Sequence, residues 1–430
     1  MIRAGIIVTG TEVLSGAVSD RNGPWLSQRL QELGLEVAEI CIVGDRPGDV
    51  HAALAAMRAQ SLQLIVTSGG LGPTADDLTV EAVAGHLGLR LQLDAALEAR
   101  IERIVRPLAQ RRGISAEAFA AGNRKQAMVP EGAIVLEPVG TAPGLVLAGQ
   151  GDSENSLVVI LPGPPRELQP MWQTATETAA PLLQLLASAG EYEIETLRMF
   201  GIPESELAQT LRDAENEGLE LARLEITTCQ HRGELEITTR VPVGARADYE
   251  TLADFLAERH PHELFSRDGA SIDEQVAQLL RGSDGDGQTL ALCESCTGGL
   301  LAGRITDLPG SSDYLLGGFV TYADTAKSSE AHVPQALIEQ HGAVSAEVAG
   351  AMAQGARVAL GASVGVGVTG VAGPGGGSEE KPVGLVWFAV AGPGTQSLVR
   401  SVRLPGNRRD VRERAVTVAM HLLRRAMTAS

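Results

Sequence analysis

The N-terminal third of the chain alternates between two hydrophobic periods, and this alternation sets the fold class. Short apolar runs at 4–8, 35–43 and 62–67 have the length of buried strands, and segments of helical period at 25–33 and 50–59 separate them. Connections this short place successive strands parallel in one sheet, with helices on both faces. The sequence therefore predicts an α/β domain on a parallel sheet.

The ends of these three strands carry glycine, threonine and acidic residues. In a parallel sheet such ends share one edge, where ligands bind. Glycines let a phosphate or a pterin approach the backbone, and carboxylates can hold a divalent metal that bridges phosphate oxygens. A glycine-rich turn with an aspartate as helix cap would explain Asp77 alone, but all three ends share the pattern, which favours a ligand site. The residues are Gly10, Thr11, Glu12, Gly44, Asp45, Gly69, Gly70, Gly72, Asp76 and Asp77.

A second candidate site lies in the C-terminal half. Apolar residues at 289–292 predict a strand, which passes through the motif E-S-C-T-G-G (294–299) into a pattern of helical period. A strand that turns into a helix at Ser295 would place its hydroxyl beside the free N–H groups of the first helical turn, where an oxyanion can be held. The alternative is that Ser295 and Thr297 only cap the helix.

The next predicted strand, at 317–322, ends at Tyr322, and Lys327 follows it. A buried lysine can act as the general base for a serine hydroxyl, because desolvation disfavours its ammonium form. Ser295, Tyr322 and Lys327 at the ends of neighbouring strands would make a Ser-Lys hydrolase site. A carboxylate at Asp324 would stabilise the ammonium form and weaken the base.

The composition narrows the range of functions. At roughly 100–200 residues per domain, the 430 residues predict two to four domains. The formal net charge of −18 argues against direct nucleic-acid binding, as a DNA-uptake accessory would require, and against an anionic membrane surface. No apolar run approaches the roughly 20 residues of a membrane span, and the N-terminus enters a strand rather than a signal peptide. We expect a cytoplasmic protein that acts on small molecules, without membrane contact.

Four cysteines are too few for a disulfide framework, which suits a reducing cytoplasm. Cys293 and Cys296 form a C-x-x-C pattern, which is typical of a redox pair or of half a zinc site. No second C-x-x-C or spaced histidine pair follows at zinc-finger distance. The pattern therefore favours a structural role for both thiols.

The chain changes character after about residue 171. An Ala- and Leu-rich segment at 173–189 predicts one helix. The following segments predict a small α+β module with the order strand, helix, strand, strand, helix, at 194–200, 205–212, 221–228, 234–241 and 247–258. Capping-box spacing at Ser271 and Glu274 then predicts the start of a helix that ends at Gly282.

Separated motifs of the N-terminal third resemble the molybdopterin-binding-like domain of CinA-type competence/damage-inducible proteins. They are GTE at 10–12, SGGLGPTADD at 68–77, NRKQ at 123–126, GTAPG at 140–144 and LPGPP at 161–165. The resemblance implies a MogA/MoaB-like α/β fold and, in the CinA branch, a metal-dependent pyrophosphatase acting on ADP-ribose and related nucleotides. It implies a nucleotide site formed by Thr11, Glu12, Asp20, Asp45, Gly69, Gly70 and Asp77, with Asp45 and Asp77 as candidate metal ligands.

The C-terminal half is similar to the nicotinamide mononucleotide (NMN) deamidase domain of the same family. The motifs are ESCTGG at 294–299, LPGSS at 308–312, GFVTY at 318–322, HGAVS at 341–345 and GPGGGSEEKPVG at 373–384. The resemblance implies hydrolysis of the carboxamide by a Ser-Lys pair, matched here by Ser295 and Lys327, with Tyr322 in the same motif. It implies substrate contacts from Cys296, Thr297, Gly298, Thr369, Gly370 and the phosphate-side Arg408. The chain departs from the family pattern at Asp324, Gly375 and Asn407.

The two resemblances together imply three parts. They are a MogA/MoaB-like parallel-sheet domain (1–171), a small KH-like α+β middle module (172–265) and an α/β deamidase domain (271–430). We expect the middle module to be a spacer or a dimerisation module without RNA binding, because it is acidic and shows no GxxG loop between Ile202 and Glu220.

The function implied is conversion of NMN to nicotinate mononucleotide and ammonia in pyridine-nucleotide salvage, by a homodimer. The deamidase would need no cofactor, whereas the ADP-ribose pyrophosphatase would need a divalent metal. The glycine-rich loop at 369–377 would close over the substrate, although a hairpin connection explains it as well. The alternative function is a non-catalytic nucleotide- or pterin-binding sensor linked to competence.

Overall fold

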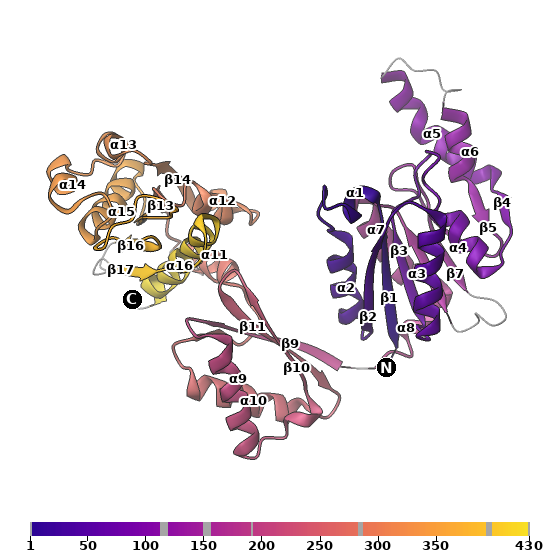
Figure 1. The fold of residues 1–430 in the computed structure, drawn as a ribbon, viewed down its shortest axis with the longest axis horizontal. Helices are drawn as coiled ribbons and strands as arrows, with labels where there is room; N and C mark the ends of the chain where they lie inside the picture. Colours follow the sequence, from indigo (N-terminus) through magenta and orange to yellow (C-terminus); the bar gives the residue numbers. More distant parts are fainter. Residues whose placement is uncertain are drawn as a thin grey trace. The chain divides into compact units, whose positions relative to one another are not determined.

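The structure is a computed structural model that describes residues 2–111, 119–148, 156–190, 192–282, 287–392 and 398–428 (Figure 1). The chain forms two compact units, Met1–Tyr192 and Glu193–Ser430. The second unit holds both the middle module and the C-terminal domain. Within the described ranges, no helix combines the length and the apolar character needed to cross a membrane.

A six-stranded sheet forms the centre of the first unit. Its strands are β1 (Arg3–Thr9), β2 (Glu36–Val43), β3 (Leu64–Ser68), β6 (Ile134–Leu136), β7 (Gly144–Ala148) and β8 (Leu157–Leu161). They lie in the order β2-β1-β3-β8-β7-β6. The pairs among β2, β1, β3 and β8 are parallel, and β7 is antiparallel to β8 and β6. The structure thus confirms the predicted α/β domain, with an antiparallel edge.

Helices cover both faces of this sheet, because successive side chains of a strand point to opposite sides. The helices are α1 (Thr11–Leu14), α2 (Asn22–Glu32), α3 (Pro47–Ala59), α4 (Thr79–Leu87), α5 (Ala95–Arg111), α6 (Ala120–Gln126), α7 (Pro165–Thr178) and α8 (Ala180–Leu186). Ile6 and Val8 of β1 join the core with α2 and α7, whereas Ile7 joins the core with α3 and α4. Outside the main sheet, β4 (Leu91–Leu93) pairs with β5 (Met128–Pro130).

The prediction of a single helix at 173–189 is wrong. Two helices occupy this part of the chain, and Ala179 between them is extended, with φ −79° and ψ 103°. Pro181 lies in the first turn of α8. Its ring clashes with the helical carbonyl four residues earlier and removes one N–H donor, which favours a break in the helix before this point.

The middle module is a four-stranded sheet with two helices. Its elements are β9 (Tyr192–Phe200), α9 (Glu204–Asn216), β10 (Glu225–His231), β11 (Glu234–Pro242), α10 (Arg246–Arg259) and β12 (Leu264–Ser266). The strands lie in the order β10-β11-β9-β12. The predicted order of elements is confirmed, but the first part of the strand expected at 221–228 is a 3₁₀ turn, Leu221–Arg223. Its leucine is needed in the core of the module, where it packs with α10.

The C-terminal domain is built on a five-stranded sheet in the order β14-β13-β15-β16-β17. The strands are β13 (Leu290–Glu294), β14 (Leu315–Val320), β15 (Val364–Gly370), β16 (Leu385–Ala391) and β17 (Leu398–Arg403). The helices are α11 (Ile272–Arg281), α12 (Leu300–Thr306), α13 (Asp324–Ser329), α14 (Gln335–His341), α15 (Ala346–Leu360) and α16 (Arg408–Thr428). β13 runs parallel to both β14 and β15. The predicted capping box of Ser271 and Glu274 is present at the start of α11.

Helix α16, yellow in Figure 1, joins the C-terminal domain to the middle module. His421 Nε2 lies 2.6 Å from Glu234 Oε1, and both side chains are 5% exposed. The imidazole stacks on the ring of Phe200 with centroids 3.8 Å apart. Thr417 Oγ1 donates to the carbonyl of Arg232 at 2.8 Å. These buried contacts hold the module against the C-terminal domain.

The buried contact of His421 predicts a pH dependence of stability. Burial lowers the pKa of His421 from its ordinary 6.5, although the hydrogen bond and charge of Glu234 act in the opposite direction. A histidine that is kept neutral by folding contributes stability above its unfolded pKa and loses it as the pH falls. We expect calorimetry to show the Tm of the parent falling more steeply from about pH 7 to pH 5 than that of His421→Gln. The exposed His262 supplies the control: His262→Gln should keep the parent slope. Equal slopes for the parent and His421→Gln would contradict this role.

Candidate functional site

The C-terminal candidate residues meet at the carboxyl ends of three parallel strands. Ser295 follows β13, and its N–H donates to Val368 O of β15 at 2.9 Å. On the other side, Thr321 N donates to Glu294 O at 2.8 Å. Ser295 therefore lies between the ends of both neighbouring strands, with 8% of its surface exposed.

Lys327 lies at the same edge on α13 and is only 2% exposed. Its Nζ donates to Thr321 O at 3.2 Å and to Asp324 Oδ1 at 3.1 Å, so the predicted carboxylate contact is present. These two bonds leave one position on the nitrogen for a third partner. Among the described contacts, no hydrogen bond joins this amine to the Ser295 hydroxyl, and such pairs often close only when substrate is bound.

The prediction that a helix begins at Ser295 is wrong. α12 begins at Leu300, after a turn in which Gly298 and Gly299 adopt φ values of 60° and 90°. Two successive left-handed residues turn the chain before the helix can start, and glycine adopts that conformation without a Cβ clash. The hydroxyl of Ser295 is thus placed by a turn and not by the first turn of a helix.

The N–H groups that open α12 are occupied by the protein's own carboxylate. Glu294 is 1% exposed, and it accepts from the N–H groups of Gly299, Leu301 and Ala302 at 2.9, 3.1 and 2.8 Å. A carboxylate at this position is stabilised by the positive end of the helix. Sequence reasoning missed this role, although a charged residue at the end of an apolar strand was a signal for it.

Arg412 on α16 holds the other side of the same turn. Its Nε donates to Cys296 O at 3.1 Å and its Nη2 to Thr297 O at 2.8 Å. Sequence reasoning missed Arg412 as well. The available signal was its position four residues after Arg408, which places both on one face of α16.

Tyr322 and Arg408 also meet. Arg408 Nη2 donates to the Tyr322 hydroxyl, and Nη1 donates to Gly373 O at 2.7 Å. Tyr322 is 59% exposed, and Arg408 is exposed as well. The pair therefore presents a cationic group to solvent at the start of α16, beside the glycine-rich loop.

The other predicted contact residues face inwards. Thr369 is fully buried, and its hydroxyl donates to Ala343 O at 2.8 Å. A Cβ on Gly370 would lie 2.7 Å from Leu385 O. Thr297 is fully buried, and its hydroxyl has no partner among the described residues. The side chains of Thr297 and Thr369 therefore lie in the protein interior.

The thiols of the C-x-x-C pattern are buried. Burial raises the pKa of Cys293 and of Cys296 to about 11 each. Both are free cysteines, and Cys293 Sγ lies 3.3 Å from Thr321 Oγ1. Across the described ranges, no group of three or more His, Cys, Asp or Glu residues is arranged to hold a metal ion.

A second candidate site is a cavity of about 360 Å³ in the first unit. It lies where β1, β3 and β8 end, as expected for the ligand edge of a parallel sheet. Five carboxylates line it, and no Lys or Arg appears among its described lining residues. The acidic residues are Glu12, Asp45, Asp76, Asp77 and Glu167.

The predicted glycines line this cavity, and they are sterically required. Gly69 and Gly70 have φ values of 105° and 67°. An added Cβ would lie 2.5 Å from Thr9 O at Gly69 and 2.1 Å from Thr79 Oγ1 at Gly70. At Gly69 and Gly70, therefore, no side chain of the residue itself covers the main chain at the cavity wall.

Two predicted residues support the first unit's site without lining the cavity. Thr11 donates to Asp45 Oδ2 through both its N–H and its hydroxyl, each at 2.8 Å. Asp20 accepts from the N–H groups of Asn22 and Gly23 at 2.9 and 3.1 Å, at the start of α2. Thr11 therefore orients a cavity carboxylate, whereas Asp20 binds the first N–H groups of α2.

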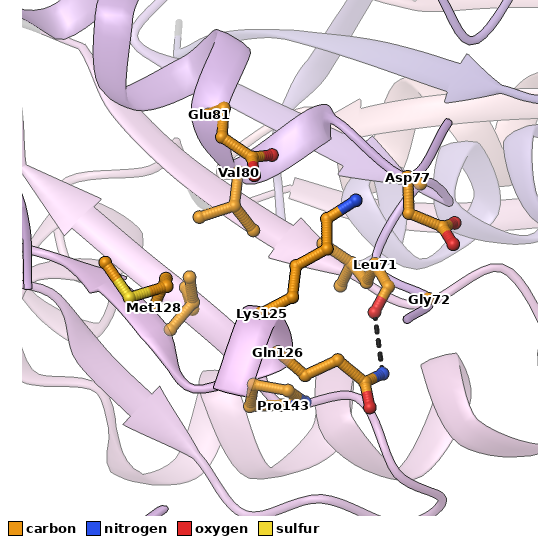
Figure 2. A pocket seen from close by; sticks show the side chains of 11 residues that line it. Leu71, Gly72, Asp77, Val80, Glu81, Lys125, Gln126, Met128 and Pro143 are labelled. Atoms are coloured by element: carbon orange, nitrogen blue, oxygen red, sulfur yellow. Dashed lines mark hydrogen bonds between the residues drawn. The ribbon is translucent and has the colours of Figure 1, made fainter. Parts of the chain in front are cut away.

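Loop 72–77 is held by its own side chains and by Lys125. Asp77 Oδ2 accepts from Thr74 N at 2.9 Å and from Thr74 Oγ1 at 2.6 Å, and Lys125 donates to Thr74 O. Figure 2 shows the neighbouring pocket, with the amine of Lys125 lying between Glu81 and Asp77. In the same view Gln126 Nε2 donates to Leu71 O, at 2.8 Å.

The donor set of the cavity fits a divalent metal that binds together with phosphate. Asp45 and Asp77 each use Oδ2 internally and leave Oδ1 without a hydrogen bond among the described residues. Mg²⁺ is commonly held by one or two carboxylates, substrate phosphates and water rather than by a complete protein cage. The residues present match that arrangement.

The fold and sites define a chain in which a molybdopterin-binding-like domain precedes an α/β domain with a serine-lysine edge. Residues 5–184 match the family model described as "Probable molybdopterin binding domain", and residues 270–427 match that of the "CinA C-terminal domain". The chain is 55% identical over 427 residues to a CinA-like protein of Mycolicibacterium vanbaalenii and 57% identical over 426 residues to one of Mycobacterium sp. (strain MCS), covering 99% of each chain. The chain belongs to the CinA-like protein family.

A solved structure titled as the competence/damage inducible protein CihA from Agrobacterium tumefaciens is 39% identical. It covers 36% of this chain and 95% of its own, with a TM-score of 0.35.

The burial of the cysteines predicts their order of reactivity. Cys229 is exposed, whereas Cys293 and Cys296 are buried with raised pKa values, so few of their thiols are ionised near neutral pH. We expect a chromogenic disulfide reagent to modify Cys229 first and to reach Cys293 and Cys296 only after unfolding. In Cys229→Ser the fast phase should disappear. Peptide mapping that finds Cys296 modified in the folded parent would show that the turn opens.

Proposed function

We propose that the C-terminal domain hydrolyses the carboxamide of NMN to nicotinate mononucleotide and ammonia, in pyridine-nucleotide salvage. The observation that carries this proposal is the buried amine of Lys327 at the strand edge that holds Ser295. Thr321 links the two, because its N–H bonds the residue before Ser295 and its carbonyl accepts from Lys327. A base and a hydroxyl at one edge support nucleophilic amide hydrolysis.

The chemistry follows from these groups. Neutral Lys327 takes the proton of Ser295, and the serine oxygen attacks the carboxamide carbon. When the tetrahedral intermediate collapses, the C–N bond breaks and Lys327 returns the proton to the leaving nitrogen, which departs as ammonia. Lys327 then removes a proton from water, which attacks the acyl-enzyme and releases nicotinate mononucleotide. The serine oxygen recovers its proton.

Arg408 would bind the phosphate of the nucleotide. A guanidinium offers several donors in one plane, which matches the geometry of phosphate oxygens. Two of its N–H groups already bond Tyr322 and Gly373, which fixes the plane of the group. Since Arg408 is solvent-exposed, a 5′-phosphate can reach its remaining donors.

This function is tested by ammonia release from NMN by the full-length chain. We expect Ser295→Ala and Lys327→Ala each to lower kcat by about 1000-fold or more, because each removes a reacting group. Ser329→Ala, at an exposed serine on the same helix as Lys327, is the matched control and should match the parent. Parent-like activity in either site variant would refute the assignment of that residue.

We further propose that the first unit is a metal-dependent pyrophosphatase for ADP-ribose and related nucleotides. Its cavity has five carboxylates and no described basic lining residue, so it would repel a pyrophosphate unless cations accompany it. Asp45 and Asp77 would hold the metal, which supplies positive charge to the phosphate oxygens. Thr11 orients Asp45, and Gly69 and Gly70 let the pyrophosphate approach the main chain.

A requirement for metal would distinguish a pyrophosphatase from a non-catalytic sensor. We expect ADP-ribose cleavage to need added Mg²⁺ or Mn²⁺, to stop with a chelator, and to fall about 100-fold or more in Asp45→Asn and Asp77→Asn. Glu102→Gln, on the surface of α5, is the control and should cleave as the parent does. If ADP-ribose instead raises the Tm but yields no product with any divalent metal, the non-catalytic sensor is the better description.

A further inference from the structure

Arg412 has no part in the proton transfers described above, yet it is bonded directly to the turn that follows Ser295. Its two donors reach the successive carbonyls of Cys296 and Thr297, at 3.1 and 2.8 Å. An added Cβ on Gly298 would lie 3.2 Å from its Nη2, so the guanidinium fills the space beside that glycine. A planar fork can span two successive carbonyls, whereas a lysine amine acts as a single point.

These bonds determine where the N–H groups of the turn point. In a trans peptide the carbonyl and the N–H point in opposite directions. With the carbonyl of Cys296 directed at Arg412, the N–H of Thr297 must face away from it. The N–H of Gly298 is returned to Ser295 O at 3.1 Å. Those of Cys296 and Thr297 have no main-chain acceptor among the described residues.

The same two N–H groups act on the Cys296 thiol, since they lower its pKa against the larger effect of burial. A thiol sulfur is a weak acceptor, so a developing oxyanion would compete with it effectively. The next N–H groups along the chain are unavailable, because Glu294 binds those of Gly299, Leu301 and Ala302. Only Cys296 and Thr297 remain as oxyanion donors within the turn.

We propose that Arg412 is a positioning residue for the reaction at Ser295. By binding the carbonyls of Cys296 and Thr297, it keeps the peptide between them turned so that the Thr297 N–H faces the reacting carbonyl oxygen. The inference rests on the proposed amide hydrolysis. It assigns the oxyanion donors of that reaction to the main chain of Cys296 and Thr297. Arg412 then affects the transition state and not the binding of the nucleotide.

The first test separates kcat from KM in the full-length chain. In Arg412→Met we expect kcat for NMN to fall on the order of 100-fold, with KM within about twofold of the parent. Arg409→Met is the matched control, because Arg409 lies on the same helix and its side chain pairs, among the described residues, with the surface residue Glu413. An unchanged kcat, or a change confined to KM, would overturn the proposal.

The second test does not depend on NMN. A fluorophosphonate probe bonds to the oxygen of an activated serine and releases fluoride, and its reaction also develops charge on an oxygen. We expect the rate of Ser295 labelling to fall in Arg412→Met by a factor similar to that for kcat, and Ser295→Ala to remain unlabelled. If the parent is labelled but leaves NMN intact, NMN is the wrong substrate, and the labelling rate of Arg412→Met still decides the role of Arg412. A parent that reacts with neither overturns both proposals.

Two further measurements guard against a general loss of structure. Millimolar guanidinium should restore part of the kcat of Arg412→Ala, which a collapsed turn would not allow. If Arg412→Met lacks a melting transition, Arg412→Lys replaces it as the test variant. The lysine keeps the positive charge but can bind only one of the two carbonyls. We expect the kcat of Arg412→Lys to lie between those of the parent and Arg412→Ala. Parent-like kcat in Arg412→Lys, or no rescue of a folded Arg412→Ala, would refute the positioning role.

Discussion

The buried carboxylate of Glu294 is the constraint on which the C-terminal site depends. A buried charge is costly unless hydrogen bonds and opposite charge compensate it. Here three N–H groups and the positive end of α12 supply that compensation. The turn between β13 and α12 cannot relax without leaving the carboxylate uncompensated. Ser295 is therefore placed chiefly by the residue that precedes it. Arg412 donates to the carbonyls of Cys296 and Thr297, which a carboxylate cannot bind.

The acidic groups of the first unit line a cavity, in contrast to the buried carboxylate of Glu294. This cavity has a volume of about 360 Å³, and none of the described lining residues is basic. Two of them, Asp45 and Asp77, are oriented by threonines that occupy one oxygen each. In the C-terminal domain, hydrogen bonds from the protein itself thus compensate the carboxylate beside Ser295. In the first unit, Asp45 and Asp77 each keep one carboxylate oxygen without a hydrogen bond among the described residues.

Much of the fold was predictable, because strand and helix periods, the capping box at Ser271 and the order of motifs are local or nearly local signals. The failures have physical causes. Pro181 divides the helix expected at 173–189, and Gly298 and Gly299 delay the helix expected at Ser295. In each case a local backbone preference outweighed a pattern extended over more residues.

The sequence by itself determined the α/β class, the family, and the serine and lysine at the ends of neighbouring strands. Only the tertiary structure showed that Arg412 binds the carbonyls of Cys296 and Thr297, from 116 and 115 positions away along the chain. It also decided that the amine of Lys327 is buried and that Arg408 meets Tyr322. The contacts of Arg408 and Arg412 depend on how α16 packs back across the domain. Periodicity and motif spacing report on residues that are close along the chain. They give no information about contacts between residues that are distant in sequence.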